Sequence, residues 1–162
     1  MKSCKFYGAS FIGTEFVGSN LKESHFNNAV FEDVVLESVK LKDTSFKGAS
    51  FKNVVFLMTD TTEVKHLNME DEGIRVFNEM PKLDMSEALK EAIEKAMVNK
   101  HVLKSRVLDT RSGDINTLSV LLLLERFDET TIIQGLMDLD NRIDRDFYTL
   151  SFIINIIKKY TE

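Results

Sequence analysis

Disulfides and membrane spans are the first features that this 162-residue sequence lacks. Its single cysteine, Cys4, cannot form a disulfide within the chain. The longest apolar run, residues 118–124, is far shorter than the roughly 20 residues that cross a bilayer. The residues after Met1–Ser3 also lack the apolar centre of a secretory signal. We therefore expect no membrane partner, and either a cytoplasmic location or secretion into a host cell without a classical signal peptide.

A strongly basic surface is also missing. The net charge is −5, and residues 1–58 contain seven lysines against six acidic residues. Residues 59–162 contain 14 basic and 20 acidic residues. Neither part has the excess of positive charge that binding to a phosphate backbone requires. The composition therefore predicts no nucleic-acid partner.

A five-residue period is what the sequence does contain, and it runs through residues 4–58 as eleven units without an insertion. The residue two before each centre is small or β-branched, and the residue two after it is mostly a turn former. The residue between the small position and the centre is mostly polar, which gives the two-residue alternation of a strand. The centres are Phe6, Phe11, Phe16, Leu21, Phe26, Phe31, Leu36, Leu41, Phe46, Phe51 and Phe56.

This pattern resembles the pentapeptide-repeat family, whose units contain a small residue, then Asp or Asn, then Leu or Phe. Only Asn20 has the family's polar residue at the middle position. The resemblance implies a right-handed β-helix in which four units make one square turn, so that residues 20 apart stack. The sequence sorts in that way into columns such as Phe6–Phe26–Phe46, Ala9–Ala29–Ala49 and Leu21–Leu41.

The five-residue period fails at residue 59, since Thr61 stands where the next large residue should be, and the pattern becomes helical from Asn68 onwards. The predicted fold class is therefore β-solenoid plus α: a β-helix over residues 1–58 and an α-helical domain over residues 59–162 that caps the last coil. The expected segments are a helix over 69–79 stopped by Pro81, a helix over 85–98 opened by an Asp84–Glu87 capping box, a helix over 115–127 capped by Asp114, a helix from Asp128 or Thr130 to Leu139, a loop over 140–142, and a helix from Asp144 or Asp146 to about Tyr160.

Catalytic chemistry has no visible basis in this sequence. One polar cluster comprises Asp138, Asp140, Asn141, Asp144 and Asp146. It does not match a calcium loop started at Asp138, because the sixth position is an isoleucine and the twelfth a threonine. The three histidines, His25, His66 and His101, lack metal-ligand spacing. We expect no catalytic, cofactor-binding or metal-binding residues, no cofactor, and no enzymatic activity.

The order of a β-helix followed by helices is similar to that of the SopA-type, HECT-like bacterial effector ubiquitin ligases. That resemblance implies a non-catalytic interaction scaffold, a fragment of such a secreted effector, with a host or bacterial protein as its partner. The family's catalytic cysteine has no counterpart, because Cys4 lies within the repeat. An alternative is a pentapeptide-repeat inhibitor of DNA gyrase that mimics DNA. The short, nearly neutral repeat disfavours this second function.

The first coil has no capping element in this sequence, because Met1 already stands at a central position of the repeat. An uncovered coil edge offers unpaired backbone groups to another strand. We therefore expect the solenoid to continue upstream, or to associate with itself through this coil.

Overall fold

The computed structural model describes residues 2–144, 146 and 149–161. The chain divides into two compact units, Met1–Glu79 and Met80–Glu162, and each unit is described by itself. None of the described helices combines the length and the apolar character needed to cross a membrane.

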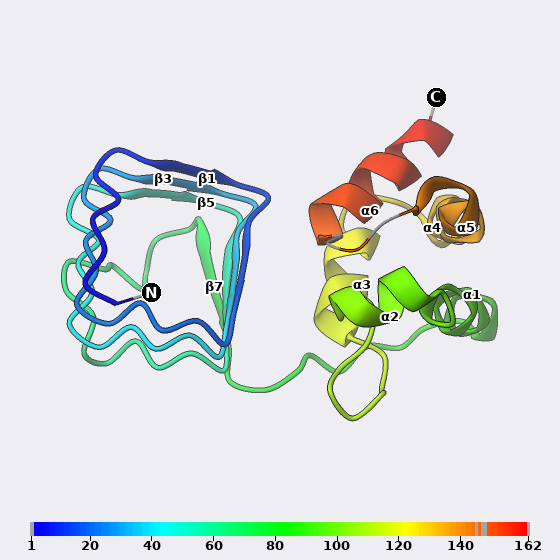
Figure 1. The fold of residues 1–162 in the computed structure, drawn as a ribbon, viewed down its shortest axis with the longest axis horizontal. Coiled ribbons are helices and arrows are strands. Elements are labelled where there is room, and N and C mark those ends of the chain that lie inside the picture. The colour runs from blue at the N-terminus through cyan, green and yellow to red at the C-terminus, as the bar shows by residue number, and fades with distance from the viewer. Residues whose placement is uncertain (1, 145, 147–148, 162) are drawn as a thin grey trace. The chain divides into compact units, whose positions relative to one another are not determined.

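The first unit is a four-sided β-solenoid, which confirms the fold class predicted from the repeat (Figure 1). Two of its sides are parallel sheets in which paired residues are 20 apart, as in the pair Phe11 and Phe31. The other two sides are joined by single bridges with the same spacing, such as Asn20 with Lys40. The sheets contain β1 (Ser10–Ile12), β3 (Val30–Glu32) and β5 (Ser50–Lys52), and β2 (Glu15–Val17), β4 (Val35–Glu37), β6 (Val54–Leu57) and β7 (Ile74–Phe77).

Stacked side chains fill the inside of the coils in the predicted columns. The rings of Phe26 and Phe46 are 5.2 Å apart and nearly parallel, and Phe31 stacks on Phe51 at 5.4 Å. Leu21 and Leu41 are fully buried along another side. Burying each such side chain stabilises the fold by roughly 1.5–3 kcal/mol, so the columns form the core of the solenoid.

The corners of the solenoid lie at the turn position of each unit. Every fifth residue from Ser3 to Met58 has a positive φ, between 47° at Met58 and 70° at Gly48. This left-handed conformation turns the chain between two short extended segments, and it suits glycine better than other residues. The turn formers seen in the sequence are therefore the residues that bend the coil.

The coil continues beyond residue 58, where the sequence period ends. β7 pairs with β6 in the same register, as Val54 lies opposite Ile74, and the first unit reaches Glu79. The helix expected over 69–79 is therefore wrong. After Met58, the described part of the first unit has a positive φ at His66 alone, eight residues later, so the corners no longer follow a five-residue spacing. The backbone ladder persists because its hydrogen bonds do not depend on that spacing.

The second unit is helical, with α4 packed between α1 and α6. Several predicted helix starts are wrong, because a nearby residue provides the cap. Ser86 caps α1 in place of Asp84, and Asn116 caps α3 in place of Asp114. The helices are α1 (Glu87–Met97), α2 (Lys100–Ser105), α3 (Thr117–Leu124), α4 (Glu129–Met137), α5 (Leu139–Arg142) and α6 (Leu150–Ile157), followed by a 3₁₀ turn (Lys158–Tyr160).

Two further differences concern the end of this unit. The loop expected over 140–142 is helical, as part of α5. The last helix begins after Thr149, whose side chain accepts a hydrogen bond from the Phe152 amide, and not after Asp144 or Asp146. Asp128 does cap α4, as one of the two predicted alternatives. The expectation that the helical domain caps the last coil stays a prediction.

Candidate functional site

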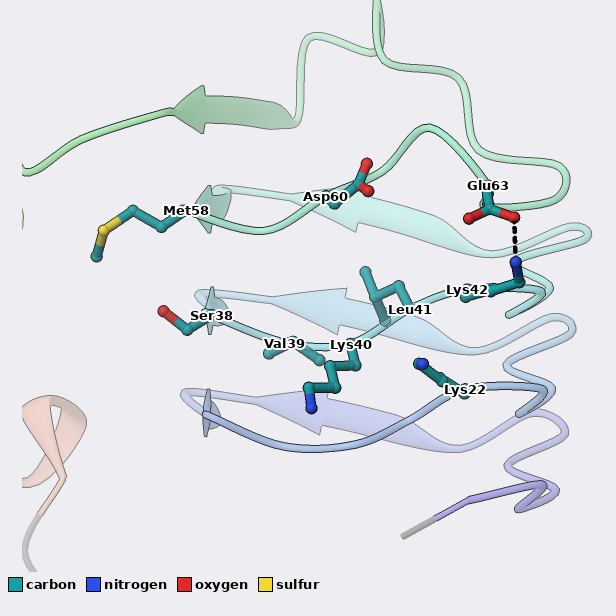
Figure 2. Close-up of a pocket in the computed structure, with 9 residues that line it drawn as sticks. All are labelled: Lys22, Ser38, Val39, Lys40, Leu41, Lys42, Met58, Asp60 and Glu63. Carbon is teal, nitrogen blue, oxygen red and sulfur yellow. Dashed lines mark ion pairs between the residues drawn. The ribbon is translucent and has the colours of Figure 1, made fainter.

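A pocket of about 380 Å³ opens on the side of the solenoid that is joined by single bridges through Asn20 and Lys40 (Figure 2). Three successive coils contribute to it. We call it the lysine pocket, and it is lined by Lys22, Ser38, Val39, Lys40, Leu41, Lys42, Met58, Asp60 and Glu63.

The register of the coils determines which side chains reach this pocket. Lys22 and Lys42 are 20 residues apart and therefore lie on successive coils of one side, with Lys40 beside them. Val39 and Leu41 alternate with the lysines and point inward, with exposed fractions of 3% and 1%. Met58 stands at a corner and is 43% exposed, which adds an apolar edge to a mostly polar lining.

One lysine of the pocket is neutralised by a neighbouring acid. The Lys42 Nζ lies 2.7 Å from the Glu63 Oε2, and this contact raises the pKa of Lys42. Asp60 is engaged elsewhere, since it accepts hydrogen bonds from the amide and the hydroxyl of Thr62 at 2.9 and 2.7 Å. These two bonds lower the pKa of Asp60 and hold its carboxylate ionised.

The other two lysines of the pocket, Lys22 and Lys40, differ from Lys42 in their surroundings. Within the part of the chain that the structure describes, neither Lys22 nor Lys40 lies within ion-pair distance of an acidic group. Figure 2 shows the Lys40 side chain running away from Asp60. The neighbouring acids Glu23 and Asp43 pair with Lys2 and Lys65 instead. With three lysines and two carboxylates the lining has a net charge of +1, and the ammonium groups of Lys22 and Lys40 suit the pocket to a singly charged anion.

The polar cluster noted in the sequence is divided among structural contacts. Asp138 accepts hydrogen bonds from Arg142 and Asn141, and Asp140 accepts one from Asn99. Asp146 contacts His101 and Lys104. Over residues 2–144, 146 and 149–161, no group of three or more His, Cys, Asp or Glu side chains could hold a metal ion.

The histidines do not come together either. His25 lies beside Tyr7 on the solenoid, with ring centroids 6.0 Å apart, and is half-buried there. His66 is at an exposed turn, and His101 belongs to α2. The lysine pocket itself was missed in the sequence. The available signal was the 20-residue spacing of Lys2, Lys22 and Lys42 next to Lys40.

The fold defines a class of protein, a β-solenoid of five-residue repeats, and one of its sides carries a lysine-lined pocket. A family model described as the SV2A/B/C luminal domain matches residues 3–74, less than half of the chain. The chain is thus similar to that domain over its solenoid. A search of curated proteins finds no match to this chain.

This match corrects the family inferred from the sequence. The pentapeptide-repeat resemblance with a SopA-type architecture is wrong as an identification, since the matching model is that of the SV2 luminal domain. A five-residue period reports the geometry of a coil, and one geometry can host unrelated functions. The order of a β-helix followed by helices also cannot identify a family, because it contains no motif of a particular family.

The function and the location expected from that family are corrected as well. The fragment of a bacterial effector ubiquitin ligase is wrong, and the gyrase inhibitor is not the class that the matching model describes either. The matched domain is luminal by its description, which contradicts a location in the cytoplasm or secretion into a host cell.

Proposed function

We propose that the solenoid of residues 1–79 is a non-catalytic binding domain that takes up an acidic segment of a protein partner in the lysine pocket. We also propose a luminal location for it, as the description of the matched domain suggests. The observation that carries the binding role is the pair Lys22 and Lys40, two ammonium groups in one pocket that have no ionic partner among the described residues.

The construction of the coil supports a binding role. Parallel pairing and the stacked rings hold the outward side chains at fixed spacing, as in the pair Asn20 and Lys40. A site held in place before binding loses little conformational entropy when a ligand arrives. The apolar atoms of Met58 and the aliphatic stems of the lysines can cover the aliphatic part of a bound side chain.

The proposed absence of catalysis is supported by the chemistry of the lining. The pocket contains lysines, two carboxylates and one serine, and no histidine or cysteine. A serine nucleophile needs a base within hydrogen-bond reach. No hydrogen bond joins the Ser38 hydroxyl to another lining residue over the described chain.

Fluorescence anisotropy of labelled peptides with the whole chain tests this function. We expect a Glu-rich peptide to bind, a Gln-rich peptide of equal length not to bind, and affinity to fall as salt screens the charges. The double variant Lys22→Gln/Lys40→Gln should lose binding. The matched control Lys5→Gln/Lys47→Gln removes the same charge from another side of the solenoid and should retain it.

Equal losses in the two double variants would contradict the proposal, because they would reflect net charge alone. Binding of duplex DNA or of anionic vesicles in preference to the Glu-rich peptide would also contradict it, since the partner would then not be a protein.

A further inference from the structure

We infer that Met58 is the specificity-determining residue of the lysine pocket, and that the acidic segment carries a large apolar side chain two residues from its acid. This inference rests on the proposed function and narrows its ligand from any acidic segment to one with an apolar residue at that spacing. The observations that carry it are the backbone conformation of Met58, its exposure and its place in the pocket lining.

Met58 occupies a position that favours a different type of residue. Its φ of 47° lies in the left-handed region, which strains most side chains and suits glycine, asparagine and aspartate. Gly18 and Ser38 occupy the same corner on the two preceding coils. Among the described residues with a positive φ, Met58 alone has a large apolar side chain. Because strained residues cluster at sites that bind ligands, this exception points to a role in binding.

Packing inside the solenoid does not explain this methionine. Met58 is 43% exposed and does not belong to the hydrophobic core of the solenoid, whereas the preceding Leu57 is fully buried. A side chain in a core offsets backbone strain by the apolar surface that it buries, and Met58 buries only part of its surface. A bound ligand that covered the rest would supply the contact that the fold does not.

The charge of the pocket is matched by one carboxylate. Three lysines and two carboxylates line it, so its net charge is +1. One carboxylate from the ligand completes this balance, and discrimination among acidic segments then has to come from uncharged contacts. Met58 offers the exposed apolar surface of the lining, since Val39 and Leu41 are buried.

The spacing between the acid and the apolar residue follows from the coil. Figure 2 shows Met58 beside Ser38 at one end of the pocket, with Lys40 nearer its middle. Lys40 is two residues after Ser38, which is about 6.6 Å along an extended chain. Side chains two residues apart in an extended ligand lie on one face at the same separation. A ligand with its carboxylate at Lys40 therefore places a side chain two residues away at Met58.

Three peptides test this inference in anisotropy titrations with the whole chain. Each contains one glutamate among serines. The first has leucines two residues from the glutamate on both sides, the second has leucines directly beside it, and the third has alanines in place of the leucines of the first. We expect the first to bind about fivefold more tightly than the other two, which corresponds to burying roughly 40 Å² of apolar surface. Leucines beside the glutamate point to the opposite face and miss Met58.

Substitutions at Met58 separate recognition from folding. Met58→Gly should reduce the preference for the first peptide to less than about twofold, although it relieves the backbone and leaves the solenoid folded. Met58→Leu keeps a large apolar side chain and should keep the preference. The matched control Met69→Gly removes another exposed methionine, which lies outside the pocket, and should keep the preference as well.

The outcomes separate this inference from the function on which it rests. Equal affinities for the first and third peptides, both lost in Lys22→Gln/Lys40→Gln, would overturn the role of Met58 and leave acidic recognition standing. Equal affinities for the two leucine peptides, or a preference that survives in Met58→Gly, would also overturn it. Failure of every glutamate peptide to bind, the Glu-rich peptide included, would overturn the two proposals together.

Discussion

Gly135 in α4 lies directly against Ile157 at the end of α6. A Cβ placed on residue 135 would be 2.5 Å from the Ile157 Cγ1 and 2.9 Å from its Cα. Gly135→Ala should therefore destabilise the helical unit by up to about 2 kcal/mol, because overpacking costs about 1–3 kcal/mol and the gain in helix propensity is roughly 1 kcal/mol. Chemical denaturation measures the change. The exposed neighbour Gln134→Ala is the control, and a more stable Gly135→Ala variant would contradict this packing.

The stacked phenylalanines predict a gradient of stability along the solenoid. Phe26 is 1% exposed and lies between Phe6 and Phe46, at 4.8 and 5.2 Å, whereas Phe6 is half-buried. Phe26→Ala should lower the free energy of unfolding by about 3–5 kcal/mol, and Phe6→Ala by clearly less. Urea unfolding followed by circular dichroism measures both. Equal losses would mean that the two rings are equally buried in solution.

The positive φ at Met58 predicts a stabilising substitution. A residue with a Cβ loses about 1–2 kcal/mol in this conformation, and glycine avoids that cost while adding about 0.5–1 kcal/mol of chain entropy on unfolding. Met58→Gly should thus raise the free energy of unfolding by about 0.5–1 kcal/mol. Met58→Ala, which retains the Cβ, is the matched control and should give no such gain in the same denaturation experiment.

Asp109 predicts a strong dependence on a single arginine. Its side chain is fully buried, one carboxylate oxygen contacts the Arg106 guanidinium, and the other has no hydrogen-bond partner among the described residues. Arg106→Ala should cost about 3 kcal/mol, since it leaves a buried carboxylate unpaired. The exposed Arg111→Ala should be nearly neutral. If Arg106→Ala/Asp109→Ala were no more stable than Arg106→Ala alone, the buried charge would not be the cause.

Asp138 predicts a loss of stability in acid. Hydrogen bonds from Arg142, Asn141 and Tyr160 lower its pKa from 3.8 to about 2. A carboxyl group with a lower pKa in the folded state stabilises the fold above its unfolded pKa. That contribution is lost as the pH falls from about 4 to about 2. Unfolding midpoints measured across this range should fall less steeply in Asp138→Asn, and parallel curves for the two proteins would contradict the prediction.

The sequence predicted the solenoid better than it predicted the helical unit. Phe11, Phe31 and Phe51 stack as their 20-residue spacing requires, because a four-unit turn brings identical positions together. Helix starts were less predictable, since Ser86 and Asp84 are both good caps and only the packing of α1 distinguishes them. α2 was not predicted at all, although Asn99 caps it.

The lysine pocket could be predicted only in part. The sequence places Lys22, Lys40 and Lys42 on one side of the coil once the 20-residue turn is known. It does not say which of them is paired, because Glu63 follows the irregular segment after Met58. Glu23 and Asp43 directly follow two of the pocket lysines in the sequence, yet their side chains pair with Lys2 and Lys65.

The sequence by itself determined a coil, since inward alternation and a turn former at every fifth residue bend the chain repeatedly in one sense. Four sides were implied by the family resemblance and supported by the sorting of residues 20 apart. Tertiary structure alone decided that the coil extends to Phe77 and that Lys22 and Lys40 form no ion pair with any residue that the structure describes. Backbone ladders continue without any side-chain period, and ion pairs depend on distances of a few ångströms between neighbouring coils. The spacing of residues along the chain therefore predicts neither where the coil ends nor which lysines form ion pairs.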